Sequence, residues 1–124
     1  ESVRRLGVLT DLGSDSSRII EAYADCDALV LECNYDSEML QKGPYPLQLK
    51  QRVSSDWGHL NNHQAANLLT KINPEKLQWL VLAHISEKNN SAELAKAAIG
   101  EVFSHTEKIL PAKQDGGFDW LAIE

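Results

Sequence analysis

Three side chains that can bind a metal or move a proton stand at the ends of apolar runs in this sequence. They are Asp11, Glu32 and His84, and the runs that precede them are 6–10, 27–31 and 77–83. Short apolar runs of this kind are typical of buried strands. Because open α/β sheets bind ligands at the carboxyl ends of their strands, we predict that the three side chains meet at one edge of one sheet.

His59 is a fourth candidate, since it lies just ahead of a predicted helix, where a side chain can swing into a cleft. Each candidate also has a plain structural interpretation. Asp11 could be a turn residue or a helix cap, His84 a packed and hydrogen-bonded histidine, and His59 a helix-entry residue in contact with solvent. Glu32 differs, because a carboxylate that an apolar strand holds partly out of water is usually paired. The combination is therefore more specific than any single member.

His59 and His63 have the four-residue spacing of a metal-binding pair on a helix. The helix is predicted to start at Asn61, however, which lies between these two histidines. In addition, no Glu follows His59 as metalloprotease chemistry requires. We therefore predict that His63 and His105 are surface residues.

The composition indicates one soluble globular domain. A chain of 124 residues can bury a modest core, and 43% apolar and 24% charged residues are ordinary values. No run approaches the roughly 20 apolar residues that cross a bilayer. Cys26 and Cys33 are predicted to be free thiols of a reducing cytoplasm. The chain lacks an initiator Met and enters a strand almost at once, so we expect a portion of a longer protein.

The formal net charge of −6 argues against general affinity for nucleic acid. Lys42, Lys50 and Arg52 nevertheless fall close together around the turn at 43–46. A local basic patch on an acidic protein can hold phosphates. A solvated surface explains the same residues equally well.

The order of predicted elements alternates strands and helices, which indicates an α/β fold with a largely parallel or mixed sheet. Capping residues mark the helix starts: Ser14 or Asp15, Asp36, and capping boxes that begin at Asn61 and Asn90. The predicted strands are 6–12, 28–32, 77–83, 109–111 and 118–123, the last two around a turn at 115–117. The predicted helices end near Ala24, Gln41, Ser54, Lys71 and Phe103, and the one ending at Ser54 begins at Pro46.

The strand-end blocks taken together resemble the C-terminal half of the metallo-β-lactamase fold. These blocks are Val8-Leu9-Thr10-Asp11-Leu12-Gly13, Leu29-Val30-Leu31-Glu32-Cys33-Asn34, Gly58-His59-Leu60-Asn61-Asn62 and Leu82-Ala83-His84-Ile85-Ser86. The resemblance implies that residues 1–124 are the C-terminal portion of one metallo-β-lactamase-like domain whose N-terminal half is absent. The whole domain would be an αββα sandwich, with a mixed sheet flanked by helices.

Further blocks are similar to one branch of that superfamily, the bacterial YycJ/WalJ-type phosphodiesterases. These are Gly43-Pro44-Tyr45-Pro46, Leu49-Lys50-Gln51-Arg52, Ser55-Asp56-Trp57-Gly58-His59-Leu60, Ser86-Glu87-Lys88-Asn89-Asn90 and the closing Gln114-Asp115-Gly116-Gly117-Phe118-Asp119-Trp120-Leu121. The resemblance covers essentially the whole chain. The Gly-Pro-Tyr-Pro and Gly-His-Leu blocks make it specific to this branch.

The resemblance implies a role for each strand-end residue. Asp11 matches the aspartate that bridges two metal ions, and His84 matches the last histidine ligand of the second metal. His59 and Glu32 are similar to the relay of the related tRNase Z, in which the histidine protonates the leaving group and the glutamate orients it. A carboxylate that lies behind an imidazole in this way fixes the tautomer of the ring.

Two kinds of departure accompany the resemblance. Leu31 replaces a histidine and Leu60 a serine of the tRNase Z pattern, which favours the YycJ/WalJ branch. The main metal motif of the family, His-x-His-x-Asp-His, and the next histidine ligand are absent from these residues. Asp11 and His84 alone cannot close a two-metal site. We therefore expect the isolated chain to be inactive and to pair with its missing half or with a second copy.

The function so implied is a cytoplasmic, metal-dependent hydrolase of phosphodiesters. We expect it to be an exonuclease that acts on nucleic acid, using two divalent ions, zinc or manganese, to activate a water. Lys50, Arg52 and Asn61 are the predicted substrate contacts. Two alternatives stay open: a hydrolase of the same fold that acts on tRNA 3′ ends, thioesters or lactones, and a non-catalytic α/β binding or scaffold domain in which the strand-end residues are only structural.

Overall fold

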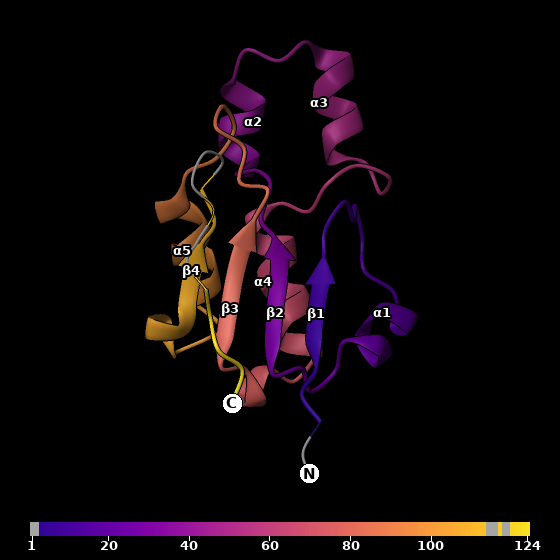
Figure 1. Ribbon diagram of the computed structural model, residues 1–124. Helices are drawn as coiled ribbons and strands as arrows, with labels where there is room; N and C mark the ends of the chain where they lie inside the picture. The colour runs from indigo at the N-terminus through magenta and orange to yellow at the C-terminus, as the bar shows by residue number, and fades with distance from the viewer. Residues whose placement is uncertain (1–2, 114–116, 118–119) are drawn as a thin grey trace.

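The computed structural model describes residues 3–113, 117 and 120–124, which form one parallel sheet with helices around it (Figure 1). The sheet has the order β1-β2-β3-β4, and each neighbouring pair is parallel. Its strands are β1 (Leu6–Leu9), β2 (Ala28–Glu32), β3 (Trp79–Ala83) and β4 (Ile109–Pro111). The helices are α1 (Ser17–Ala22), α2 (Ser37–Lys42), α3 (Leu47–Ser54), α4 (Asn62–Lys71) and α5 (Ala92–Gly100), with 3-10 turns at Pro74–Lys76 and Thr106–Lys108. The predicted α/β fold is confirmed.

The core lies between the sheet and two helices that cover one of its faces. Successive side chains of a strand point to opposite faces, and in β2 and β3 the residues that face α4 and α5 are leucines. The buried cluster comprises Leu29, Leu31, Leu80 and Leu82 of the strands, Ala65, Leu68 and Leu69 of α4, and Ala95 and Ile99 of α5. In Figure 1, α4 and α5 lie behind the sheet, while α2 and α3 stand beyond the carboxyl ends of the strands.

Side-chain caps begin several of the helices where the sequence predicted them. Asp36 accepts a hydrogen bond from the Met39 amide, and Asn61 forms a complete capping box with Gln64. Helix α5 is capped by Ser91, one residue after the predicted Asn90. The first helix differs from its prediction, because the hydroxyl of Ser16 caps it rather than Ser14 or Asp15, and it ends at Ala22 rather than Ala24.

Several predicted elements are shorter than expected because the backbone changes conformation inside the apolar run. The first strand ends at Leu9 rather than at residue 12, since Asp11 adopts a left-handed backbone with φ of 56°. The third strand begins at Trp79, because Leu77 closes the preceding 3-10 turn. Helix α5 ends at Gly100 rather than Phe103.

Only part of the predicted C-terminal β structure is observed. Residues 109–111 form β4 as predicted, but residues 120–123 are not a strand, so that prediction is wrong for them. Residues 118–119, and 115–116 of the predicted turn, lie outside the described residues. In place of a strand, 120–124 is tied to the sheet by single bonds, such as the one from Trp79 Nε1 to the Ala122 carbonyl oxygen, at 2.9 Å.

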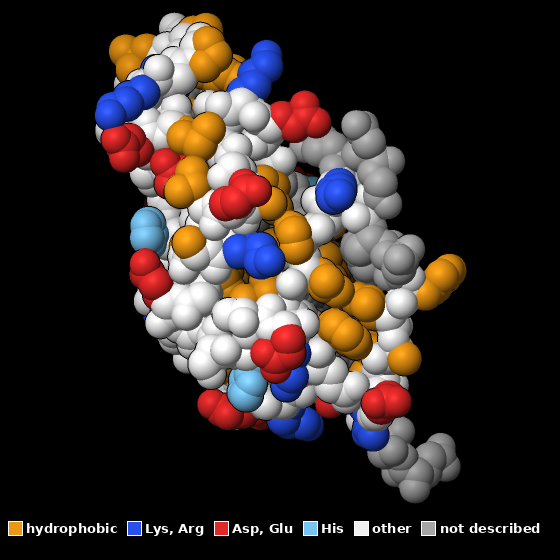
Figure 2. Space-filling view, turned by 90° about the vertical axis from the view of Figure 1, so that its left-hand side faces the viewer, with side chains coloured by type: hydrophobic (Ala, Val, Ile, Leu, Met, Phe, Trp, Pro, Cys, Tyr) orange, Lys and Arg blue, Asp and Glu red, His pale blue; other side chains and the backbone are white. Residues whose placement is uncertain are grey.

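The second face of the sheet carries apolar side chains that no helix covers. Leu6 is 61% exposed and Val8 is 51% exposed. Leu6 borders an apolar groove of about 470 Å³, together with residues of β2, β3 and the C-terminal segment. Figure 2, which views the molecule from the side of α5 and β4, shows hydrophobic side chains gathered on this side of the molecule. Among the described helices, none has the length and apolar character that spanning a membrane requires.

Candidate metal and acid–base site

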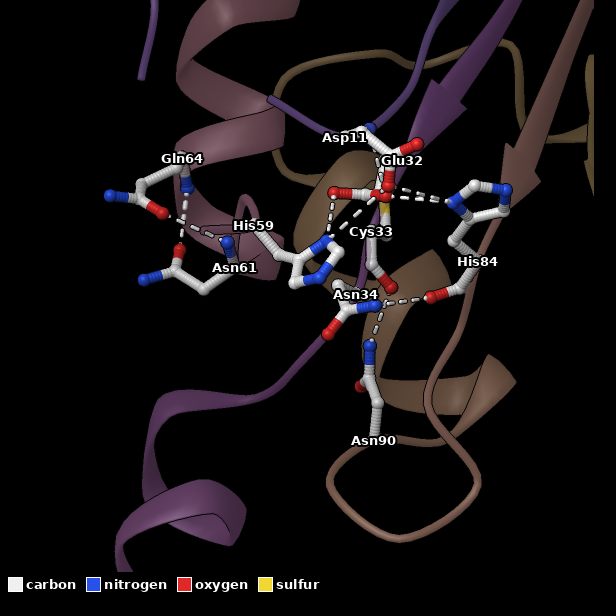
Figure 3. A network of polar contacts seen from close by, with 9 residues as sticks. All are labelled: Asp11, Glu32, Cys33, Asn34, His59, Asn61, Gln64, His84 and Asn90. Atoms are coloured by element: carbon white, nitrogen blue, oxygen red, sulfur yellow. Dashed lines mark hydrogen bonds and ion pairs between the residues drawn. The ribbon is translucent and has the colours of Figure 1, made fainter. Parts of the chain in front are cut away.

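Glu32, the last residue of β2, is the centre of a polar cluster at the carboxyl ends of the strands (Figure 3). Its carboxylate is fully buried, and each oxygen faces one imidazole. Oε1 lies 2.8 Å from His84 Nδ1, and Oε2 lies 3.1 Å from His59 Nδ1. The backbone amide of Asp11 also donates to Oε1, at 3.1 Å. The structure thus brings together the three residues that the sequence predicted at this edge and the fourth candidate, His59.

The contacts of Glu32 decide which nitrogen of each histidine is free. An ionised carboxylate only accepts hydrogen bonds, so Nδ1 carries the hydrogen in both His59 and His84. The Nε2 atoms are then open to a metal ion or to a proton. This carboxylate–histidine arrangement orients the ring and raises its basicity as a ligand.

Asp11 and His84 both have left-handed backbones, with φ of 56° and 53°. Such conformations are uncommon for residues other than glycine, and they are concentrated at functional sites. Asp25 and Asn73 share them elsewhere in the chain, so a positive φ alone does not mark a site. At Asp11 and His84 the positive φ occurs in residues whose side chains lie close together. Asp11 Oδ1 lies 3.9 Å from the Nδ1 of His59 and 4.0 Å from that of His84.

The cluster contains donor atoms suited to a metal ion. One ligand atom each from Asp11, Glu32 and His59 lies within 4.8 Å of the others. The two oxygens of Glu32 are already occupied by imidazole N–H groups, whereas the side chain of Asp11 is 73% exposed. Asp11 is therefore the more available carboxylate, and Nε2 is the nitrogen of His84 that remains free to bind a metal.

The cluster forms one end of an open cleft of about 820 Å³ that both His59 and His84 line. Two predicted substrate contacts are engaged elsewhere, since Lys50 Nζ donates to the Gln41 carbonyl oxygen and the Asn61 side chain serves as a helix cap that also bonds Ser37. The described residues that line the cleft do not include Lys50, Arg52 or Asn61.

Other residues that sequence reasoning missed do line the cleft: Asn34, Tyr45, Leu49, Val53, Lys88 and Lys113. Asn34 donates from Nδ2 to the His84 carbonyl oxygen at 2.9 Å, and so holds the left-handed turn at that residue. The signal that could have found Lys88 is its place in the loop directly after the strand that ends before His84.

The remaining histidines are surface residues and the cysteines are free thiols, as predicted, although Cys33 directly follows Glu32 of the cluster. His63 and His105 are exposed. Cys26 and Cys33 are buried free thiols. Burial raises the pKa of both thiols, that of Cys33 to about 12.

Comparison with known proteins finds relatives over most of the chain. Exodeoxyribonuclease YycJ from Bacillus anthracis is 37% identical over 99 residues, which are 80% of this chain and 38% of that protein. Exodeoxyribonuclease WalJ from Streptococcus pneumoniae serotype 2 (strain D39 / NCTC 7466) is 38% identical over 88 residues, which are 71% of this chain and 33% of that protein. No protein-family model matches the chain.

A solved structure shares the fold. The metallo-β-lactamase fold protein YhfI from Bacillus subtilis matches with a TM-score of 0.61 and 22% identity, over 91% of this chain and 38% of that chain. The sheet, its flanking helices and the strand-end cluster thus belong to a protein of the metallo-β-lactamase fold.

Within that class the chain is YycJ/WalJ-like, which confirms the resemblance predicted from its sequence blocks. It spans 38% and 33% of the length of the two relatives described.

Proposed function

We propose that this chain is the C-terminal portion of a metal-dependent nuclease that hydrolyses phosphodiester bonds, and that it supplies one side of the active site. The observation that carries the proposal is the fully buried Glu32 carboxylate, which orients two histidines and leaves both Nε2 atoms open. The names of the relatives, exodeoxyribonucleases YycJ and WalJ, support nucleic acid as the substrate and exonucleolytic action.

Asp11 and His84 are the residues that hold divalent metal in this proposal. Carboxylate oxygen and imidazole nitrogen accept zinc or manganese; Asp11 Oδ1 lies 4.0 Å from His84 Nδ1, and His84 lines the cleft. Bound divalent ions of this kind polarise a phosphodiester and generate hydroxide near neutral pH. The remaining ligands come from the rest of the longer protein, so the isolated chain is inactive.

His59 is the proton donor in the proposed mechanism. When its ring carries a second proton, Nδ1 stays bonded to Glu32 and the Nε2–H group is available to the oxygen that leaves the phosphorus. Glu32 fixes the ring and stabilises its positive charge. The proposed location is the cytoplasm, which the two free and buried thiols support.

The test uses the longer parent protein with zinc or manganese and compares two substrates. Replacing the proton donor in His59→Ala should reduce kcat on an oligonucleotide by about 10²–10⁴-fold, because its alkoxide leaving group needs a proton. The same variant should change little on an activated p-nitrophenyl phosphodiester, whose leaving group needs none. His84→Ala should abolish activity on both substrates and lower the amount of bound metal.

Two outcomes would contradict the proposal. One is a parent protein that hydrolyses a thioester or a lactone but no phosphodiester, which favours another hydrolase of this fold. The other is full activity in His84→Ala, which makes the strand-end residues structural. The matched control is His63→Ala, since His63 is exposed on α4 and does not line the cleft.

A further inference from the structure

The cleft beside His59 and His84 has lining residues that the proposed chemistry does not use. Its volume of about 820 Å³ extends well beyond the polar cluster. Two kinds of side chain line it: an aromatic and aliphatic group from α3 and the loop before it, and charged residues from the loops that follow β3 and β4. A cleft with one apolar and one basic group suits a ligand that has an apolar ring and an anionic group.

The basic group consists of Lys88 and Lys113. Within the described residues, neither ammonium makes a hydrogen bond or an ion pair. Several other lysines are already engaged by protein oxygens, namely Lys42 by Glu38, Lys50 by Gln41, Lys71 by Asp15 and Lys108 by Leu77. Glu87 also lines the cleft, so among the described residues that line it the lysines outnumber the carboxylates by one. Uncommitted ammonium groups that line a cleft are available to phosphate oxygens.

The apolar group consists of Tyr45, Leu49 and Val53, all of which are partly exposed. Pro44 and Pro46 flank Tyr45, and a proline fixes its own φ and restricts the residue before it. The aromatic ring therefore stands on a stiff segment. Leu49 and Val53 lie one helical turn apart on α3 and extend the same apolar surface. An aromatic side chain with an aliphatic border is a platform for a nucleobase.

We propose that this cleft is a nucleotide-binding subsite in which Lys88 and Lys113 hold backbone phosphates and Tyr45 stacks on the base at the reacting end of a strand. The inference rests on the proposed nuclease function and names the part of the substrate that the chain recognises. Stacking and charge are both tolerant of base sequence, so the subsite selects a nucleic acid over a small phosphodiester without selecting one base.

The first experiment tests the role of the two lysines through the salt dependence of KM, in the longer parent protein loaded with metal. KM for a single-stranded oligonucleotide is recorded over a range of KCl concentrations for Lys88→Met, Lys113→Met and the control Lys76→Met. Lys76 is an equally exposed lysine in the 3-10 turn before β3, at the other end of the sheet. Each cleft variant should reduce the slope of log KM against log salt by about 0.7. The control should leave that slope unchanged.

The second experiment tests the role of the Tyr45 ring by measuring kcat/KM for activated phosphodiesters. One substrate is methyl p-nitrophenyl phosphate, and the other is thymidine p-nitrophenyl phosphate, used as its two positional isomers. Tyr45→Leu should lower kcat/KM for at least one thymidine ester about tenfold, because a stacked base is lost. It should leave the methyl ester unchanged, and Tyr45→Phe should restore the thymidine ester. Circular dichroism melting checks that Tyr45→Leu folds; where it does not, the salt slopes of the two lysine variants decide the inference.

The outcomes distinguish failure of the nucleotide subsite from failure of the nuclease proposal. An active parent protein whose salt slope is unchanged in both lysine variants, and whose preference for thymidine esters is unchanged in Tyr45→Leu, overturns the subsite alone. A parent protein that hydrolyses neither the oligonucleotide nor the esters overturns the nuclease proposal and the subsite with it.

Discussion

Glu32 shows how one side chain can organise a site that is otherwise exposed. Its buried carboxylate accepts the amide of Asp11 and one N–H from each of two imidazoles. Hydrogen bonds to an ionised acceptor are roughly twice as strong as neutral ones, so the carboxylate has enough donors to remain buried. The same bonds fix both rings, whose outer parts are a third to a half exposed, at 34% for His59 and 49% for His84.

Cys33, next to Glu32, gives a residue-scale prediction about pH. Its pKa is raised from an ordinary 9.0 to about 12, first because burial disfavours the thiolate and second because the Glu32 charge repels it. The folded state therefore keeps the proton longer than the unfolded state. The resulting stability is fully present below the unfolded pKa of 9.0 and is lost as pH rises toward 12.

Urea unfolding of the chain at several alkaline pH values measures this loss. Between about pH 9 and pH 11, the free energy of unfolding should fall more steeply in the wild type than in Cys33→Ala, by up to about 1.4 kcal/mol per pH unit. The variant is less stable at neutral pH because it leaves a small cavity, but that difference does not depend on pH. Parallel pH profiles for the two proteins would contradict the assignment.

The residues of the central cluster could be predicted because strand ends leave a sequence signal. Asp11, Glu32 and His84 each follow an apolar run, and His59 lies just ahead of a predicted helix. The residues that line the cleft could not be predicted in the same way. Lys88 and Lys113 are exposed lysines in loops, and only the packing of the loops shows which surface lysines face a cleft.

Asn61 gives a prediction at the scale of an element. Its side-chain Oδ1 accepts a hydrogen bond from the Gln64 backbone amide at 2.7 Å, and its own backbone amide donates to Gln64 Oε1 at 2.8 Å. Asn61→Ala should lower the free energy of unfolding by about 1 kcal/mol, since α4 loses its cap. Asn61→Ser keeps a cap acceptor and should cost less, as chemical denaturation can measure.

The same pair of variants tests whether Asn61 contacts substrate. If its role is the cap, Asn61→Ser should leave KM for an oligonucleotide unchanged in the longer parent protein. A raised KM in a variant of nearly normal stability would restore Asn61 to the substrate contacts that the sequence predicted. The control is Asn67→Ser, on the exposed side of the same helix.

Elements were predictable where local chemistry alone sets their limits. The capping residues Asp36 and Asn61 begin α2 and α4 where predicted, and apolar β2 has the predicted bounds. The ends of β1 and α5 were predicted too late, because an apolar residue can follow an element as well as belong to it. At Asp11 the left-handed turn is held by its bond to Glu32, a tertiary contact that local sequence does not reveal.

At the scale of the whole molecule, the sheet is covered by helices on one face and only partly covered on the other. The uncovered apolar surface centres on Leu6 and Val8 of the edge strand β1, beside the groove of about 470 Å³. Exposed apolar patches of this kind mark interaction sites. The chain also spans only 38% of the length of its YycJ relative. We therefore expect the isolated chain to form a dimer through this face.

Sedimentation equilibrium over a range of concentrations measures the monomer–dimer equilibrium. Val8→Lys should shift the chain to monomer, because dimerisation through this face would then bury a charge. The matched control is Val102→Lys, which alters a valine that is 40% exposed beyond the end of α5. A wild-type chain that stays monomeric, or a control that dissociates the dimer equally, would contradict the prediction. In the longer parent protein Val8→Lys should instead lower the melting temperature, because there the additional residues, rather than a second copy, occupy the face.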